Sequence, residues 1–320
     1  MIKVIKYNVS YFKVWNEFIT DSKNATFLFH RDFMEYHQDR FDDYSLLAFE
    51  GEKLVAVLPA NRVEDEVYSH QGLTYGGFYF APKLKIIEIE TILSSIFQFL
   101  KKEKIKRLVV KNILPFYEVE AQGVSFLLMN RFKAQLIKRE MNLMIDYKMP
   151  LKISKSKLKH FRKIAKLGLE IRQDNDCTPF WNLVLLPRLE QKYGTKPVHS
   201  LEEINALMYT FPTNIFQYSV YFNDEIIAGL TLFISKYGIK SQYGATTALG
   251  VKYRALDFLF INLIENFKNQ GFSFFDMGTV SEDNEKGYNE GLLQQKLELG
   301  CSIFNQDRLL LNLNELKDLN

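Results

Sequence analysis

The chain has 320 residues, 47% hydrophobic and 14% aromatic, so it is long enough for two domains and too apolar for a disordered protein. A formal charge of +3 argues against DNA as the main partner. Two cysteines, Cys177 and Cys301, exclude a disulfide framework, and no ligand spacing is typical of a metal site. Without a signal-peptide core or an apolar run of ~20 residues, we expect a cytoplasmic protein with no transmembrane segment.

Two segments of the chain share one pattern. Residues 54–77 (LVAVLPANRVEDEVYSHQGLTYGG) align without a gap with residues 226–249 (IIAGLTLFISKYGIKSQYGATTAL), which puts Gly72 opposite Gly244. Each segment predicts strand, turn and strand, and the flanking patterns also match. In the first copy we expect a preceding strand at 44–50, a following helix at 85–102 and a last strand at 107–113. In the second copy the corresponding elements are expected at 217–223, 255–268 and 272–278. The order predicts tandem copies of one unit, in domains 1–150 and 151–320.

The stretch YSHQGLTYGGF (68–78) places three glycines in an aromatic run that favours a strand. Glycine inside a strand marks a bulge or a close approach of another group. Because the repeat makes this stretch the first copy of SQYGATT, we expect a strand here. We also expect His70 and Tyr75 to face a cleft between the halves, with Gly76 and Gly77 leaving room for a substrate.

A basic helix is predicted between the two copies, at 154–168, where a glycine closes it. Its charge has two interpretations, a solvated face or a patch for phosphate-bearing substrates. A strand at 169–173 and helices at 181–194 and 199–211 follow, the last with a Ser200–Glu203 capping box. His199 precedes that cap and is a candidate general base, or it only starts the helix.

Three stretches resemble tandem GNAT acyltransferases, a superfamily that includes Fem-type (FemABX) peptidoglycan aminoacyltransferases and acetyltransferases of polysaccharide gene clusters. They are KSKLKHFRKIAKLGLEIR (155–172), SQYGATTALGVKYRALDFLFINLI (241–264) and FFDMGTVSEDNEKGYNEGLLQQKLELG (274–300). The resemblance implies a mixed α+β chain of two GNAT-like domains, each a mostly antiparallel sheet flanked by helices. It also implies that the acyl donor enters where parallel strands 239–245 and 272–278 splay apart.

The donor implied by this resemblance is acyl-coenzyme A, with acetyl-CoA as co-substrate and no permanently bound cofactor. The usual glycine-rich pyrophosphate turn is missing, because ALGVKYRALDF contains only Gly250, and Lys252 and Arg254 are expected to supply charge instead. Fem-type enzymes use aminoacyl-tRNA and also lack that turn, so this donor stays an alternative. The expected donor-binding residues are Gln242, Tyr243, Gly244, Lys252, Arg254 and Gly278.

Lys296 is the favoured catalytic residue, because the resemblance implies that it orients a phosphate or carbonyl; the alternative is an ordinary exposed helical lysine. Glu282 and His199 are the other catalytic candidates, as proton acceptors. The alternatives for Glu282 are a residue that binds the amine and an ordinary solvated loop glutamate. The expected acceptor-binding residues are Arg31, Tyr36, His70, Tyr75 and Asn289; the alternative for Arg31 is a surface ion pair with Asp32 or Glu35.

The expected function is an N-acyltransferase that acts by direct transfer within a ternary complex. Its acceptor would be the amine of an activated, phosphate-bearing amino sugar or cell-envelope precursor. The alternatives are a Fem-type transferase that uses aminoacyl-tRNA, with tRNA as partner, and a non-catalytic ligand-binding protein that keeps the fold.

Overall fold

The computed structural model describes residues 1–119 and 122–317. The chain forms two compact units, an N-terminal unit of Met1–Glu140 with the described residues from Asn305 on, and a C-terminal unit of Met141–Phe304. The sequence assigns residues after 304 to the second domain. In the structure they belong to the N-terminal unit, because β15 (Ser302–Asn312) pairs with β8 (Arg107–Lys111).

The N-terminal unit contains two sheets. One has the order β1-β3-β4-β7, and the other includes β15-β8-β6-β5-β2. The remaining strands and the helices of this unit have these bounds: β1 (Ile2–Lys6), α1 (Phe12–Asp21), α2 (Arg31–Met34), β2 (Asp42–Asp43), β3 (Leu46–Glu50), β4 (Lys53–Leu58), β5 (Asn61–Val63), β6 (Glu66–Tyr68), β7 (Tyr79–Phe80), α3 (Ile86–Lys102) and α4 (Val124–Phe126).

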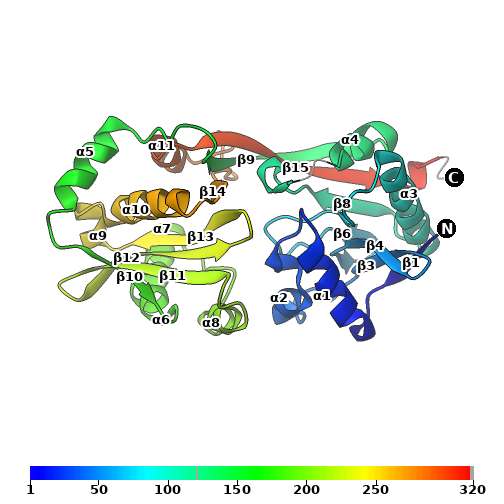
Figure 1. Ribbon diagram of the computed structural model, residues 1–320, viewed down its shortest axis with the longest axis horizontal. Helices are drawn as coiled ribbons and strands as arrows, with labels where there is room; N and C mark the ends of the chain where they lie inside the picture. Colours follow the sequence, from blue (N-terminus) through cyan, green and yellow to red (C-terminus); the bar gives the residue numbers. More distant parts are fainter. Residues whose placement is uncertain (120–121, 318–320) are drawn as a thin grey trace. The chain divides into compact units, whose positions relative to one another are not determined.

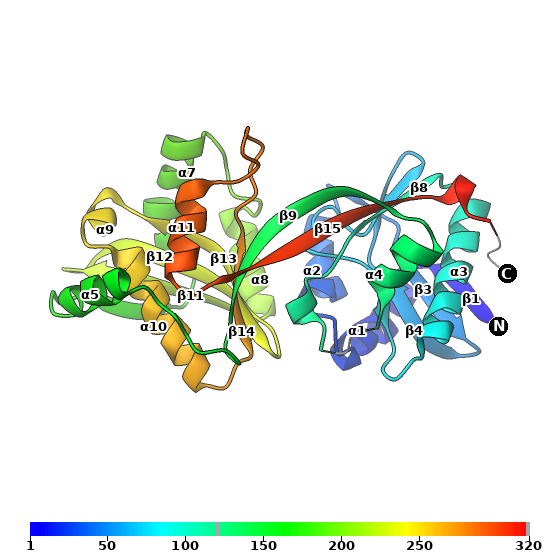
Figure 2. The same cartoon turned by 90° about the horizontal axis from the view of Figure 1, so that it is seen from above.

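The C-terminal unit is built on the strand order β10-β11-β12-β13-β14, followed by the end of β9 (Gln135–Asp146). In Figure 1, α10 lies against one face of this sheet and α6 and α8 against the other; Figure 2 shows α5, α10 and α11 from above. The bounds are α5 (Lys155–Ile164), β10 (Glu170–Asp174), α6 (Thr178–Phe180), α7 (Leu186–Tyr193), α8 (Leu201–Thr210), β11 (Ile215–Phe222), β12 (Glu225–Ile234), β13 (Gly238–Thr246), α9 (Ala248–Lys252), α10 (Ala255–Asn269), β14 (Phe274–Thr279) and α11 (Glu290–Glu298).

Apolar residues at helical spacing explain the two long helices. The inward residues of α3 include Ile89, Leu93 and Leu100, which are completely buried, and α10 buries Leu259 and Ile264 in the same way. Each such side chain contributes about 1.5–3 kcal/mol when it leaves water. The helices predicted at 85–102 and 255–268 are therefore confirmed, whereas α5 ends at Ile164, earlier than predicted.

The repeat is visible in the strand registers. Glu66–Tyr68 of β6 pairs in parallel with Arg107–Val109 of β8, and Gly238–Lys240 of β13 pairs in parallel with Phe274–Asp276 of β14. In both units the parallel pairing stops after three residues, and the other pairs reported for the described residues are antiparallel. The predicted mixed, mostly antiparallel GNAT-like unit is confirmed twice over.

The expected strand across residues 68–78 is wrong, because β6 ends at Tyr68 and a loop follows. The loop returns to β8, where the Gly76 N–H donates to the Lys111 carbonyl (3.0 Å) and the Ser69 hydroxyl accepts from the Lys111 N–H (2.9 Å). Glycines permit this folding: a Cβ on Gly76 would overlap the Ser69 carbonyl, and one on Gly72 would overlap the His37 ring. In the N-terminal unit, the space beyond the parallel pair is thus closed by this loop, through the Ser69 hydroxyl and the Gly76 N–H.

Gly76→Ala is expected to lower the free energy of unfolding by about 1–3 kcal/mol, because the added methyl group meets backbone that cannot move aside. Gly291→Ala in α11 is the matched control, since a Cβ there has only Asn289 Oδ1 nearby, at 3.6 Å. Chemical denaturation of both variants measures the difference. A Gly76→Ala protein as stable as Gly291→Ala would contradict this account of the loop.

Candidate active site

The candidate site lies where β13 and β14 stop pairing, after Lys240 and Asp276. Beyond that point β13 continues against β12 alone, and β14 continues against β9. Both strands are irregular here, because the β12–β13 register skips Gln242 and the β14–β9 register skips Met277. Such bulges re-aim backbone groups and are frequent beside active sites.

A buried ion pair joins the two strands at their last paired residues. Lys240 Nζ lies 3.3 Å from Asp276 Oδ2, with side chains 9% and 0% exposed. The other oxygen of Asp276 accepts from Asn142 Nδ2 (2.9 Å) and from the Gly278 N–H (2.7 Å). The carboxylate therefore holds the turn at Gly278, whose φ of +76° suits glycine. This pair is not among the residues predicted from the sequence, although an aspartate within the apolar strand FFDMG is a visible signal.

Lys296 extends from α11 to the same turn. Its side chain is buried, and its ammonium donates to the carbonyl oxygens of Gly278 (3.1 Å) and Thr279 (2.9 Å). The alternative of an ordinary exposed helical lysine is therefore wrong. Burial, reinforced by the charge of Lys240, lowers the pKa of Lys296 to about 8. An ammonium has three N–H donors, so two contacts leave one for a ligand.

His199 and Tyr243 form a second pair at the start of the splayed part of β13. His199 Nδ1 lies 2.5 Å from the Tyr243 hydroxyl, which also accepts from the His199 backbone N–H at 3.3 Å. Burial raises the pKa of Tyr243 to about 12. Trp181 packs edge-on against Tyr243, with 5.0 Å between ring centroids. These contacts explain His199 as a residue that holds Tyr243, and its role as general base stays a prediction.

Glu282 and Asn289 lie together in the exposed loop between β14 and α11. Glu282 accepts hydrogen bonds from Asn289 Nδ2 (3.0 Å) and Asn284 Nδ2 (3.0 Å). Asn289 also caps α11, because its side-chain oxygen accepts from the Leu292 N–H (2.9 Å). The contacts give both residues a structural role in the loop, and contact with substrate stays a prediction.

The N-terminus of α10 carries the charged groups expected near the donor. Lys252 and Arg254 are exposed just before it, and Arg254 has the left-handed φ of +50°. Asp257 in the first turn binds the ammonium of Lys157 at 2.6 Å, which buries one cation of the basic helix α5. Of the two interpretations of α5, a wholly solvated face is therefore wrong for Lys157.

The expected acceptor-binding residues all belong to the N-terminal unit except Asn289. Arg31 is buried and paired with Glu35 (3.0 Å) and Asp43 (2.7 Å). The contacts explain Arg31 as a structural residue, and its binding of a substrate phosphate stays a prediction.

Three further candidates in this unit are aromatic. Tyr75 is buried, with its hydroxyl 3.0 Å from Thr26 Oγ1. Tyr36 and His70 both stack on His37, at centroid distances of 4.2 and 5.0 Å. His70 is also buried, and among the described residues its Nδ1 has no hydrogen-bond partner. Burial lowers the pKa of His70 to about 3, so this imidazole is neutral at physiological pH.

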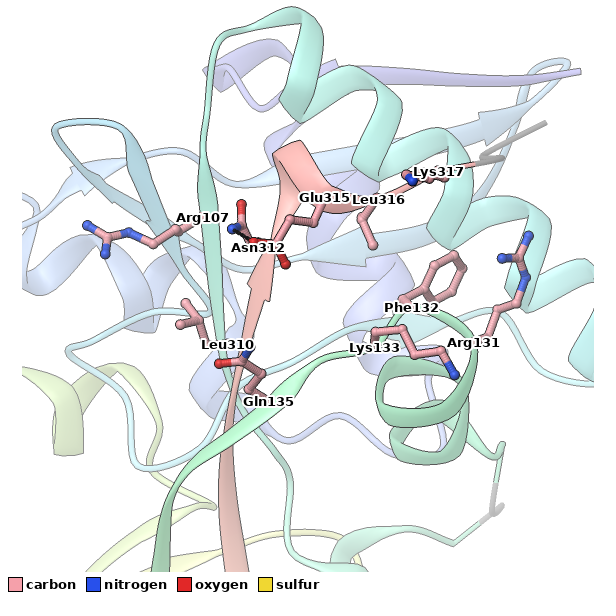
Figure 3. Close-up of a pocket in the computed structure, with 10 residues that line it drawn as sticks. All are labelled: Arg107, Arg131, Phe132, Lys133, Gln135, Leu310, Asn312, Glu315, Leu316 and Lys317. Atoms are coloured by element: carbon pink, nitrogen blue, oxygen red, sulfur yellow. Dashed lines mark hydrogen bonds between the residues drawn. The ribbon is translucent and has the colours of Figure 1, made fainter.

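The N-terminal unit also has a hollow of about 460 Å³ that is lined by residues of β8, of β15 and of the segments 131–135 and 315–317. Arg107 and Arg131 lie on opposite sides of it (Figure 3), and each pairs with a carboxylate, Glu66 or Glu90. These two arginines therefore do not converge on one ligand position. Within residues 1–119 and 122–317, no three His, Cys, Asp or Glu side chains gather as metal ligands. No helix in that part of the chain is long and apolar enough to cross a membrane.

Two units, each with a short parallel pair that splays after three residues, define a tandem GNAT-like fold. The chain is similar to the crystal structure of FemX, with a TM-score of 0.70 and 10% identity over 95% of this chain and 96% of that one. L-PGS from Bacillus licheniformis matches with a TM-score of 0.60 and 11% identity, over 95% and 91%. A tandem GNAT protein from the clavulanic acid biosynthesis pathway matches with 0.52 and 7%, over 99% and 100%. No protein-family model and no curated protein matches the sequence. The resemblance drawn from the sequence is thus confirmed for the fold.

Proposed function

We propose that the protein is an N-acyltransferase that moves an acyl group from acyl-coenzyme A to an amine. The observation that carries the proposal is the point where β13 and β14 stop pairing. Beyond it both strands are irregular, and Lys296 donates a hydrogen bond to the Gly278 carbonyl of β14. The likeness to FemX and to a tandem GNAT protein supports it at the level of the fold. The acceptor we propose is an amino sugar or cell-envelope precursor, used in the cytoplasm.

The transfer needs a neutral amine, a polarised acyl carbonyl and a fixed line between them. The amine nitrogen bonds to the acyl carbon, the carbon–sulfur bond of the donor breaks, and the amine loses a proton as the thiol forms. Backbone N–H groups released from pairing beyond Lys240 and Asp276 are the donors for the developing oxyanion. Lys296 holds the Gly278–Thr279 turn and has one N–H left for the donor or the oxyanion.

Aminoacyl-tRNA is the second candidate donor, because a specific surface favours it. The basic helix α5 packs on α10, with Phe161 and Phe258 stacked at 5.5 Å. This contact brings exposed lysines of α5, such as Lys155 and Lys159, to the side of α10. A polyanion would gain from several such cations, whereas the pyrophosphate of coenzyme A needs only the first turn of α10.

Thermal unfolding with each donor tests the proposal. Because a ligand that binds the native state stabilises it, saturating acetyl-coenzyme A should raise the Tm, by the equivalent of about 2.7 kcal/mol at one hundred times Kd. Lys252→Glu/Arg254→Glu should remove this rise, while Lys268→Glu at the far end of α10 should retain it. A rise with charged tRNA alone would select the second donor. A protein that transfers nothing from either donor to a panel of amino sugars would be a binding protein.

A further inference from the structure

Lys240 is a buried ammonium with more hydrogen-bond donors than partners. Its side chain is 9% exposed, and among the described residues its ammonium has one acceptor, Asp276 Oδ2 at 3.3 Å. The second oxygen of Asp276 accepts from Asn142 Nδ2 and from the Gly278 N–H. An ammonium has three N–H donors, and burying donors without acceptors costs free energy. Lys240 therefore has donors to offer to a ligand.

Gly278 leaves space beside this ammonium. A Cβ on Gly278 would lie 3.6 Å from Lys240 Nζ, and outside residues 277–279 no other heavy atom of the described residues lies within 4 Å of that position. Because Gly278 comes two residues after Asp276, this space lies where β13 and β14 stop pairing. A ligand group held there would contact Lys240 beside the proposed site of transfer.

The cluster of Lys240, Asp276 and Lys296 carries more positive than negative charge. Lys240 and Asp276 both act electrostatically on Lys296, which is charged below its pKa of about 8. Cys301 also lies near Lys296, and burial raises the pKa of its thiol, so it stays neutral. The two ammonium groups therefore share the one carboxylate of the cluster, although a buried charge without a counter-ion is costly. A bound anion would offset the excess.

The alternation of side chains along the strands indicates which substrate would supply that anion. Phe275 packs against Phe260 and Phe267 of α10, at centroid distances of 6.3 and 6.2 Å. Successive residues of a strand point to opposite faces, so Asp276 and its register partner Lys240 face away from α10. The pyrophosphate of coenzyme A would bind at the N-terminus of α10. An anion at Lys240 therefore belongs to the acceptor and not to the donor.

We propose that Lys240 binds a phosphate or carboxylate group that the acceptor carries near its reacting amine. This role of Lys240 rests on the proposed function, because the acceptor is the one used in that reaction. Lys240 positions the acceptor from the face opposite α10, while Lys296 keeps its remaining N–H for the donor or the oxyanion. An amine without an anionic group loses this contact and binds less tightly.

Binding of small amines to the full-length protein tests the proposal, with two pairs of probes that differ in one anionic group. Glucosamine 6-phosphate and glucosamine are the phosphate pair, and glycine and glycinamide are the carboxylate pair. In NMR titrations the anionic member of one pair should bind at least ~10-fold more tightly than its twin, the scale of one hydrogen bond between charged groups. The pair that shows this preference identifies the anionic group. Lys240→Met should remove the preference, and Lys236→Met, in the exposed turn between β12 and β13, should retain it.

Lys240→Met leaves Asp276 without its counter-ion, so a second variant is needed in case the first does not fold. Lys240→Met/Asp276→Asn has no buried charge at this pair and keeps a side-chain oxygen for the Gly278 N–H. Its Tm should lie close to that of the native protein, and it should lack the preference. Equal binding within both pairs of probes, or a preference that survives in the double variant, would overturn the site. A preference that depends on Lys240 but is accompanied by no acyl transfer would reject the proposed function and retain the site. Acyl transfer that does not distinguish the members of either pair would do the reverse.

Discussion

Lys296→Met is expected to lower turnover of acyl donor and amine at least ~10²-fold, the scale of a lost electrostatic donor in an active site. The ammonium holds the carbonyl oxygens of Gly278 and Thr279, and methionine keeps the volume but neither contact. Steady-state kinetics should show the loss mainly in kcat, because the reacting groups and not the remote parts of the substrates lose their positions.

The pH dependence separates this role from a purely structural one. With a pKa of about 8, Lys296 loses its charge above pH 8, so activity that needs the ammonium should fall there. The ordinary lysine pKa is 10.5, so between pH 8 and 10.5 the unfolded chain binds more protons and the contribution of Lys296 to stability rises with pH. A fall in activity in that range is therefore not unfolding caused by this group. Lys268→Met is the control, and a Lys296→Met enzyme with near-native turnover would remove Lys296 from the site.

Asp276→Ala is expected to lower the free energy of unfolding of the C-terminal unit by about 3–5 kcal/mol. The substitution leaves the buried ammonium of Lys240 without its counter-ion, and it also removes the acceptor of the Gly278 N–H. This is a larger effect than a typical core substitution. Urea denaturation measures it, followed by Trp181 fluorescence in a Trp15→Phe background, since the chain has two tryptophans and Trp15 lies in the other unit.

The double variant Lys240→Met/Asp276→Leu supplies the control. If the loss comes from an uncompensated charge, removing both partners should recover most of the stability, because well-packed apolar residues often replace buried pairs without cost. Activity should not recover, since the Gly278 turn still lacks its acceptor. A double variant as unstable as Asp276→Ala alone would show that the carboxylate acts through shape or hydrogen bonds and not through Lys240.

The long helices and the central strands could be predicted because their apolar residues follow one local period. The same is true of the Ser200–Glu203 capping box, whose two hydrogen bonds (2.8 and 3.1 Å) form between residues three apart. The loop at 69–78 could not be predicted in this way. Its aromatic composition favours a strand, and only the contacts of Gly72 and Gly76 with His37 and Ser69 exclude one.

The candidate site was predicted in part. The resemblance put Gly278 and Lys296 in one stretch, 274–300, with separate roles, and the structure connects them by a hydrogen bond from the Lys296 ammonium to the Gly278 carbonyl. The pair of Lys240 and Asp276 is separated by 36 residues. A pair of this kind depends on which strands become neighbours, which no local pattern states.

The amino-acid sequence by itself determined that the chain has two copies of one α+β unit, because hydrophobic period and turn residues recur in the same order. Only the tertiary structure decided that the copies differ in use. In the first unit the gap after the parallel pair is closed at Lys111, whose carbonyl accepts from the Gly76 N–H and whose N–H donates to the Ser69 hydroxyl. In the second unit, β13 continues along β12, and the side chains of Lys240, Asp276 and Lys296 lie where β13 and β14 separate. The two units differ because each backbone finds different long-range contacts, and a repeat in the sequence does not specify those contacts.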